Sequence, residues 1–352
     1  MSDFAINTVD LSPEGDALCI VDQTLLPGTV KMLRLTAHKD IWQAIYTLQV
    51  RGAPAIGIAA AIGMYLAAKE IVADDFDGFM AQFAEKKAYL ASARPTAVNL
   101  FWALDQMEAC ALSHRGEALP AVVAALRAEA MCLREEDIAM CKAIGRHGAP
   151  LIQPGMGVLT HCNAGALATV AYGTATAPIY RAKELGVQNF TVYCDETRPL
   201  LQGARLTAFE LMQNGVDTCL LCDNMAASLM QQGRVQLVLV GADRIARNGD
   251  AANKIGTLGV AILAAHYGIP FYVCAPTSTI DMAMADGGGI EIEQRAPAEV
   301  TEMWYQKRMA PEGVRVYNPA FDVTGHGLIT GIITQHGIAK APYEAAFRAW
   351  GL

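Results

Sequence analysis

Short apolar runs alternate with helical patterns through the second part of the chain, and this alternation constrains the fold more than any other feature. Five runs rich in β-branched and aromatic residues recur after Pro150: GMGVLTHC, FTVYCD, VDTCLLCD, VQLVLVGAD and PFYVCAP. Strands of this kind, separated by helices, are typical of a parallel sheet that is covered on both faces. The intervening helices are expected at 164–185, 204–214, 225–232 and 253–267.

The first part of the chain has the spacing of helices instead. After LCIVDQTLLPG, which indicates a strand and a turn, helices are expected at 40–50, 54–72, 76–92, 95–113 and 120–144. Pro54, Pro95 and Pro120 suit the first turn of a helix. The sequence therefore predicts an α/β protein with two domains, a mainly helical one over 1–145 and a parallel-sheet one over 146–352.

Composition limits the classes of partner. Of the 352 residues, 53% are hydrophobic and 18% charged, and the net charge of −8 comes without a basic block, which argues against nucleic acid or an anionic membrane as partner. Nine cysteines, an odd number, and no signal-peptide pattern favour a reducing cytoplasm. The apolar run 53–68 is shorter than the about 20 residues of a membrane span. Cys219 and Cys222 form a CxxC that we assign to a core strand, not to zinc or redox chemistry.

Polar residues follow all five apolar runs. The strand exits read HCNAG, CDETRP, CDNMA, GADRIARNGD and APTSTID. Carboxyl ends of parallel strands meet at one edge, where ligands bind in open α/β sheets, so the exits predict a pocket. No GxGxxG, Walker A pattern or histidine pair with metal-ligand spacing occurs, and the sequence predicts neither a cofactor nor a metal.

Cys162 and Asp243 stand at two of these exits, and each has two interpretations. Cys162 is either a buried structural thiol or a reactive one, activated by a helix that starts just after it. His161 is expected on the opposite strand face, so it does not pair with Cys162. Asp243 either forms a salt bridge with Arg244, Arg247 or Lys254, or acts as a general acid whose pKa is raised by apolar walls.

Two arginines in the helical part suggest an anion site. Arg51 and Arg94 each precede a helix that is expected to begin with proline, where free N–H groups favour an anion. Gly52 allows close backbone approach, and Lys254, expected to open a helix, adds a third positive charge. Together they indicate a phosphate clamp.

Several long motifs resemble the methylthioribose-1-phosphate isomerase family. They are RGAPAIG, LTHCNAGALAT, DETRPLLQGARLTAFEL, DNMA, GADRI…NGD…NKIGT, PTSTID and NPAFDVT, and the resemblance extends from about residue 20 to 338. The wider family includes ribose-1,5-bisphosphate isomerases and the regulatory subunits of translation-initiation factor 2B, which generally lack the Cys/Asp pair. The resemblance implies a mainly helical first domain with a small sheet, a Rossmann-like second domain, a homodimer and a metal-free aldose–ketose isomerisation.

The resemblance also implies the site residues. Cys162 and Asp243 would be catalytic, and the substrate contacts would be Arg51, Gly52, Ala53, Arg94, Gln202, Asn253 and Lys254. The chain departs from the family at 325–327, where GHG replaces the usual proline after DVT, and at Gln335, where glutamate is common. These departures bear on substrate range.

The implied substrate is 5-methylthioribose 1-phosphate, with 5-deoxyribose 1-phosphate as a second candidate. Two alternatives stay open. The first is ribose 1,5-bisphosphate isomerisation, for which no second basic cluster is evident. The second is a non-catalytic subunit that senses a sugar phosphate or nucleotide, against which the presence of both Cys162 and Asp243 argues.

Overall fold

The computed structural model describes residues 7–95 and 97–352, which divide into two compact units. The first unit runs to Cys141 and also takes in the segment Gly165–Gly173. The second unit comprises Lys142–Ala164 and Thr174–Leu352. The chain therefore leaves the second unit directly after Ala164 and returns to it at Thr174.

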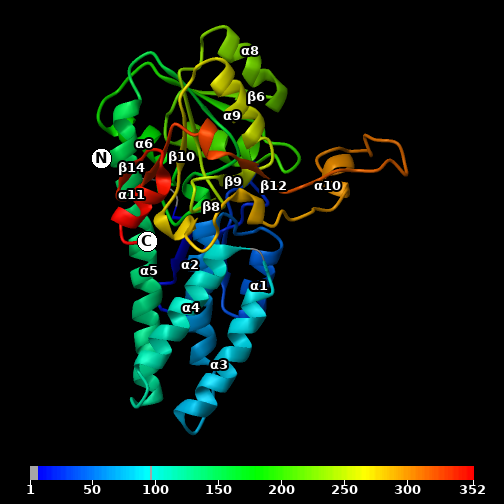
Figure 1. Cartoon of the computed structure of the whole chain (residues 1–352). Coiled ribbons are helices and arrows are strands. Elements are labelled where there is room, and N and C mark those ends of the chain that lie inside the picture. Colours follow the sequence, from blue (N-terminus) through cyan, green and yellow to red (C-terminus); the bar gives the residue numbers. More distant parts are fainter. Residues whose placement is uncertain (1–6, 96) are drawn as a thin grey trace. The chain divides into compact units, whose positions relative to one another are not determined.

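The first unit is built around helices that run side by side (Figure 1). Its elements are β1 Val9–Leu11, β2 Leu18–Val21, β3 Met32–Leu35, α1 His38–Tyr46, α2 Ala53–Lys69, α3 Phe76–Ala91, α4 Val98–Ser113 and α5 Leu119–Gly148, which continues into the second unit. The three strands form a small antiparallel sheet in the order β1-β2-β3. The five expected helices and the small sheet are thus confirmed.

Helix α2 lies at the centre of the first core because its sequence is apolar and small on every side. Nearly all of it is buried. A Cβ added at Gly57 would lie 2.8 Å from the backbone oxygen of Asn99 in α4, so glycine is what allows the two helices to approach this closely.

The second unit contains a seven-stranded sheet in the order β14-β13-β10-β7-β4-β5-β6. Its strands are β4 Gly157–Thr160, β5 Thr191–Asp195, β6 Thr218–Leu221, β7 Leu237–Val240, β10 Phe271–Cys274, β13 Gly331–Thr334 and β14 Gly337–Ala339. All neighbours pair in parallel except β13 and β14. The five apolar runs therefore form parallel strands, as predicted.

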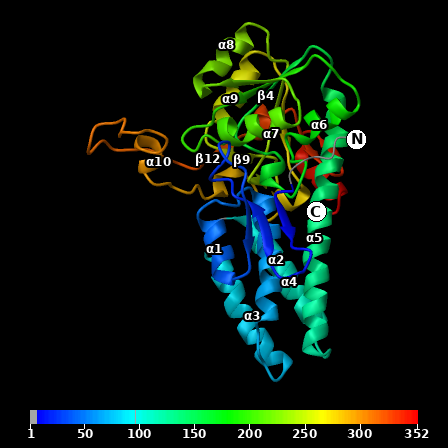
Figure 2. The ribbon, with the colours of Figure 1, turned by 180° about the vertical axis from the view of Figure 1, so that it is seen from behind.

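A second, four-stranded sheet in the order β11-β8-β9-β12 follows β7 in the chain. It comprises β8 Arg244–Ala246, β9 Ala251–Lys254, β11 Ile280–Asp281 and β12 Phe321–Thr324. The helices of the unit are α6 Ala177–Glu184, α7 Ala208–Gln213, α8 Ala226–Gln231, α9 Thr257–His266, α10 Ala298–Thr301 and α11 Tyr343–Ala349. The segment around α10 extends away from the rest of the unit (Figures 1 and 2).

Two helix predictions were wrong at their starts. Residues 164–176 contain only the short turn Ala166–Ala168, and α6 begins at Ala177, because the segment Gly165–Gly173 packs within the first unit. Asn253 and Lys254 do not open a helix but lie in β9, and α9 begins only after Gly256, whose φ of 103° suits glycine.

The CxxC pair does not lie in a core strand, contrary to our assignment. Strand β6 is the edge of the large sheet, and Cys219 and Cys222 are both exposed. Within the part of the chain that the structure describes, no helix combines the length and the apolar character needed to cross a bilayer.

Candidate active site

Strand order in the large sheet reverses between β4 and β7. From β4 the chain adds β5 and β6 on one side, and then β7, β10 and β13 on the other. Such a switch point opens a crevice beyond the carboxyl ends of the two central strands, where α/β proteins bind their ligands. Cys162 follows β4 by two residues, and Asp243 follows β7 by three. The two predicted catalytic residues therefore occupy the two exits that flank the switch point.

These two exits are in close contact. Leu159 of β4 pairs with Val238 of β7, which brings the ends of both strands to the same level. A Cβ added at Gly241, two residues before Asp243, would lie 2.5 Å from the Cβ of Ala164. Only glycine fits at this position, and its absence of a side chain lets the two exits approach each other.

Cys162 lies beyond the end of its strand in a strained conformation. Its φ is 65°, which is uncommon for a residue other than glycine. Cys162 is buried, with 8% of its surface exposed. Two backbone bonds fix it: Cys162 N–H donates to Thr197 Oγ1 at 2.8 Å, and Thr207 Oγ1 donates to the Cys162 carbonyl at 2.6 Å. No helix starts just after Cys162, so the activation by a helix dipole that the sequence suggested has no basis in the described residues.

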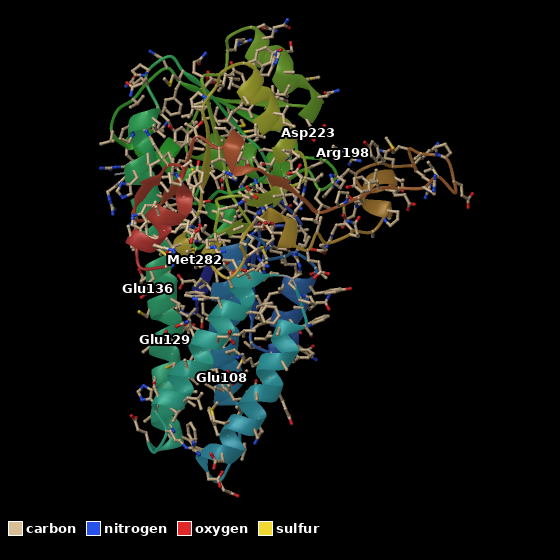
Figure 3. All side chains as sticks on the ribbon, in the orientation of Figure 1. Glu108, Glu129, Glu136, Arg198, Asp223 and Met282 are labelled. Carbon is tan, nitrogen blue, oxygen red and sulfur yellow. The ribbon has the colours of Figure 1, made fainter. Side chains whose placement is uncertain are left out.

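Asp223 holds the neighbouring exit from β5. Its two carboxylate oxygens accept hydrogen bonds from the backbone N–H groups of Thr197 and Arg198, both at 2.7 Å. Figure 3 shows Arg198 and Asp223 close together in the second unit. Thr197, which binds Cys162, is therefore itself anchored by Asp223.

Asp243 lies half-buried at the start of the β8–β9 hairpin. Its N–H donates to the carbonyl of Ala252 at 2.8 Å, so Asp243 stands beside Asn253 across the hairpin. Two residues considered as salt-bridge partners have acidic neighbours elsewhere: Arg244 lies 3.8 Å from Asp281, and Arg247 lies 3.8 Å from Glu344. The hairpin thus joins Asp243 to the predicted substrate contacts Asn253 and Lys254.

The side chains of Asn253 and Lys254 are held by local contacts. Asn253 is buried, and its Nδ2 donates to Thr257 Oγ1 at 3.1 Å. Lys254 Nζ donates to the carbonyl of Ala320 at 2.8 Å and lies 4.5 Å from the centre of the Phe321 ring. Both contacts tie the end of β9 to its surroundings.

Gln202 carries a buried oxygen that the described residues leave unsatisfied. The residue is 5% exposed, and its Oε1 has no hydrogen-bond partner among them. A Cβ at the next residue, Gly203, would lie 1.7 Å from the Asp195 carbonyl, so Gln202 is held tightly against the β5 exit. Because a buried acceptor without a donor costs about 1–3 kcal/mol, Gln202 is a ready binding point for a ligand hydroxyl.

The remaining predicted contacts lie in the first unit. Gly52 caps α2 with a φ of 93°, and a Cβ there would lie 2.4 Å from Ala168. Arg51 and Ala53 flank it, so this arginine does precede a helix that carries proline in its first turn. The matching expectation for Arg94 was wrong, because α4 begins at Val98 with Ala97 as its N-cap. Arg51 and Arg94 are both half-buried.

A buried histidine–aspartate pair was missed by the sequence analysis. His161 Nδ1 lies 3.0 Å from Asp195 Oδ2, and His161 Nε2 lies 2.9 Å from the carbonyl of Ile255. With Asp223, the pair places three ligand-type atoms within 4.8 Å of one another. Since His161 and Asp223 already use these atoms in protein hydrogen bonds, the geometry is that of a polar network. In the sequence, only the position of His161 directly before Cys162 pointed to a role for this histidine near the site.

The two departures from the family pattern have structural roles in the second unit. His326 donates its N–H to Asp250 Oδ1 at 2.7 Å, and its Nδ1 lies equally close to the same oxygen. Gln335 accepts a hydrogen bond from the Thr277 N–H at 3.1 Å and donates to Thr277 Oγ1 at 2.6 Å. His326 therefore holds the loop that follows β8, and Gln335 holds the loop that follows β10.

Comparison with known proteins adds a consistent set of relatives. A model of the initiation factor 2 subunit family matches residues 49–341. A methylthioribose-1-phosphate isomerase of Symbiobacterium thermophilum is 64% identical over 97% of this chain and 95% of its own length. A 5-deoxyribose 1-phosphate isomerase of Moorella thermoacetica is 54% identical over 92% of each chain. The solved 5-methylthioribose 1-phosphate isomerase of Pyrococcus horikoshii superimposes with a TM-score of 0.89 at 41% identity, covering 97% of this chain and 95% of its own.

Proposed function

This chain belongs to the initiation factor 2 subunit family, and we propose that it is an aldose–ketose isomerase that converts 5-methylthioribose 1-phosphate to 5-methylthioribulose 1-phosphate. The reaction is a step of methionine salvage. The observation that carries the proposal is the placement of Cys162 and Asp243 at the two exits that flank the switch point. The 64% identity to an enzyme with this name supports it independently.

The chemistry explains why a proton donor and a proton acceptor are needed together. In a furanose 1-phosphate the anomeric oxygen is esterified, so the ring does not open by simple mutarotation. Opening requires proton donation to the ring oxygen, and isomerisation then moves hydrogen from C2 to C1. One positioned acid or base contributes about 10²–10⁴-fold to such a rate.

We assign the acid role to Asp243 and the base role to Cys162. Asp243 in its protonated form donates to the ring oxygen as the C1–ring oxygen bond breaks. Cys162 as thiolate takes the C2 proton, and the resulting enol phosphate is reprotonated at C1 while its 2-hydroxyl loses a proton to the Asp243 carboxylate, which gives the ketose. A direct hydride shift from C2 to C1 is the alternative, in which the two residues move only the hydroxyl protons. The tight approach at Gly241 supports a shared site for the pair.

We propose the substrate contacts from the local structure of each unit by itself. In the second unit, the unsatisfied Oε1 of Gln202 is suited to accept a sugar hydroxyl, and Asn253 and Lys254 follow Asp243 on the same hairpin. In the first unit, we propose that Arg51, the N–H groups at Gly52 and Ala53, and Arg94 bind the phosphate. A helix N-terminus with an adjacent arginine is suited to an anion.

We further propose 5-deoxyribose 1-phosphate as a second substrate, because a relative with that name is 54% identical. Ribose 1,5-bisphosphate is disfavoured because the sequence has no obvious second basic cluster for its 5-phosphate. A regulatory subunit without activity is disfavoured by the presence of both Cys162 and Asp243. The enzyme is proposed to act as a cytoplasmic homodimer.

Phosphorus NMR tests the function directly. Purified protein is mixed with 5-methylthioribose 1-phosphate, without added metal or nucleotide. The anomeric phosphate ester signal is expected to be replaced by that of a primary ketose phosphate. An unchanged spectrum from protein shown to be folded would contradict the proposal. The same assay with 5-deoxyribose 1-phosphate, compared by kcat/KM, ranks the two substrates.

A further inference from the structure

His161 sits between two hydrogen-bond acceptors. Its Nδ1 lies 3.0 Å from a carboxylate oxygen of Asp195, and its Nε2 lies 2.9 Å from the Ile255 carbonyl. His161 is 1% exposed and Asp195 is 0% exposed, so water does not replace either bond. A neutral imidazole carries one N–H donor, whereas this geometry needs a proton at both nitrogens.

The proton count of the pair follows from this geometry. One proton stays on Nε2 and points at the Ile255 carbonyl. The other lies between Nδ1 and Asp195 Oδ2. A carbonyl oxygen cannot donate, so removal of either proton leaves a buried acceptor without a donor. His161 and Asp195 together therefore hold two protons as long as both bonds persist.

The charges around the pair agree with this count. Burial lowers the pKa of His161, but the hydrogen bond and charge of Asp195, the Ile255 carbonyl and the charge of Asp223 raise it further than burial lowers it. Burial raises the pKa of Asp195, and His161 only partly offsets this. Both shifts make the pair retain its protons to higher pH. Asp322, on β12, also interacts with His161 through its charge. The negative charge of Glu196 raises the pKa of Asp195 further.

The pair joins three elements of the candidate site. His161 directly precedes Cys162 at the exit of β4, and Asp195 ends β5. Ile255 directly follows Lys254 at the end of β9. The contact is fitted closely, since a Cβ at the next residue, Gly256, would lie 2.7 Å from His161 Cε1.

We propose that the His161–Asp195 pair, holding two protons, is a positioning device that fixes the Asn253–Lys254 end of β9 relative to the Cys162 exit. His161 acts through its Nε2–H bond to Ile255, and Asp195 keeps the ring protonated and oriented. The assignment of a substrate role to Asn253 and Lys254 rests on the proposed function. The proton count and the bond to Ile255 stand without it.

Nitrogen NMR of the histidine rings tests the proton count without any substrate. Between about pH 6 and about pH 9 the signals of His161 are expected to stay constant with Nε2 protonated. In Asp195→Asn, Nδ1 is expected to lose its proton and accept from the new amide. A titration of the His161 ring within this pH range, or an Nδ1 that stays protonated in Asp195→Asn, would overturn the proposal.

Two substitutions of His161 test the positioning role. The amide nitrogen of glutamine stands near Nε2 and that of asparagine near Nδ1. His161→Gln is therefore expected to keep the bond to Ile255 and a KM within about threefold of the parent, whereas His161→Asn loses that bond and raises KM about tenfold. His266→Gln is the matched control and leaves KM unchanged. Equal KM values in His161→Gln and His161→Asn would rule out action through Ile255.

Failure of this inference can be told from failure of the proposed function. If the parent protein does not convert the sugar phosphate, the function fails, and the ring NMR still decides the proton count. If the parent converts it and the two His161 variants share one KM, only the positioning role fails. Where a His161 variant does not fold, Asp195→Asn provides the ring measurement on the natural histidine.

Discussion

Cys162 donates its backbone N–H to the side-chain oxygen of Thr197 at 2.8 Å, and the two residues have nearly the same unusual φ, 65° and 66°. A positive φ is a genuine outlier for β-branched threonine and costs about 1–3 kcal/mol. The hydrogen bonds that Asp223 accepts from the N–H groups of this loop offset that cost. Strain kept in two adjacent strand exits indicates that the position of Cys162 is fixed before substrate arrives.

Removing the oxygen of Thr197 is expected to displace Cys162. Thr197→Val preserves the shape of the side chain but leaves the Cys162 N–H buried without an acceptor, which costs about 1–3 kcal/mol. We expect kcat to fall about 10-fold to 100-fold. Thr197→Ser keeps the oxygen and is expected to retain most activity. Steady-state kinetics of both variants decide the matter, and equal rates for valine and serine would show that the bond is not needed.

Loss of either proposed catalytic group is expected to remove most turnover while the fold survives. Cys162→Ser and Asp243→Asn should each lower kcat by about 10²–10⁴-fold, because each removes one positioned acid or base. Cys132→Ser, at an exposed thiol, is the control and should match the parent enzyme. Circular dichroism verifies the fold. Near-normal rates in both variants would refute the assignments.

Arg51 is expected to act on binding more than on chemistry. Arg51→Ala removes the proposed charge-assisted contact to the phosphate and should raise KM about 10-fold to 100-fold with a smaller change in kcat. Arg115→Ala, at an exposed arginine that pairs with Asp77, is the control. An unchanged KM in Arg51→Ala would exclude this residue from the phosphate site.

The route of the migrating hydrogen can be read from the product. If a base removes the C2 proton, reaction in D₂O is expected to place deuterium at C1 of the ketose, because the enol phosphate is reprotonated from an exchangeable site. Proton NMR of the isolated product measures the deuterium content at C1. Full retention of the original hydrogen would favour the hydride shift, or a base that does not exchange with water.

A buried carboxyl in the first unit is expected to make stability depend on pH. Burial raises the pKa of Asp137 to about 7, although the Val170 N–H and Arg134 act to lower it. The native state thus binds this proton more tightly than the unfolded state. The contribution of this proton to the free energy of unfolding is fully present below about pH 4 and is lost as pH rises through about 7. Its upper limit is about 4 kcal/mol.

Asp137→Asn tests this dependence, because the amide oxygen can still accept the bond that the Val170 N–H donates at 2.7 Å. The thermal midpoint of the variant is expected to fall less between pH 4 and pH 7 than that of the parent. Glu136→Gln, the exposed neighbour on α5 (Figure 3), is the control and should follow the parent. A thermal midpoint of the parent protein that rises between pH 4 and pH 7 would contradict the raised pKa of Asp137.

Local pattern alone determined many elements of this protein. The five helices of the first unit and five of the six parallel strands of the second follow from apolar periodicity, because side chains on one face of a helix or on both faces of a covered strand must leave water. The strand exits with Cys162 and Asp243 could be singled out for the same reason, since polar residues directly after a buried strand have a restricted set of places to lie.

Tertiary structure decided what those elements do together. That β4 and β7 are neighbours, and that their exits therefore meet, depends on the order of strands across the sheet, which no local pattern encodes. The helical spacing at 164–176 was overridden because Gly165–Gly173 packs within the first unit. The helical spacing at Asn253 was overridden because β9 pairs with β8 and β12. The His161–Asp195 bond joins residues 34 positions apart. Such contacts arise only when distant segments are brought together, because their energy comes from packing and pairing across the fold and not from the residues beside them in the chain.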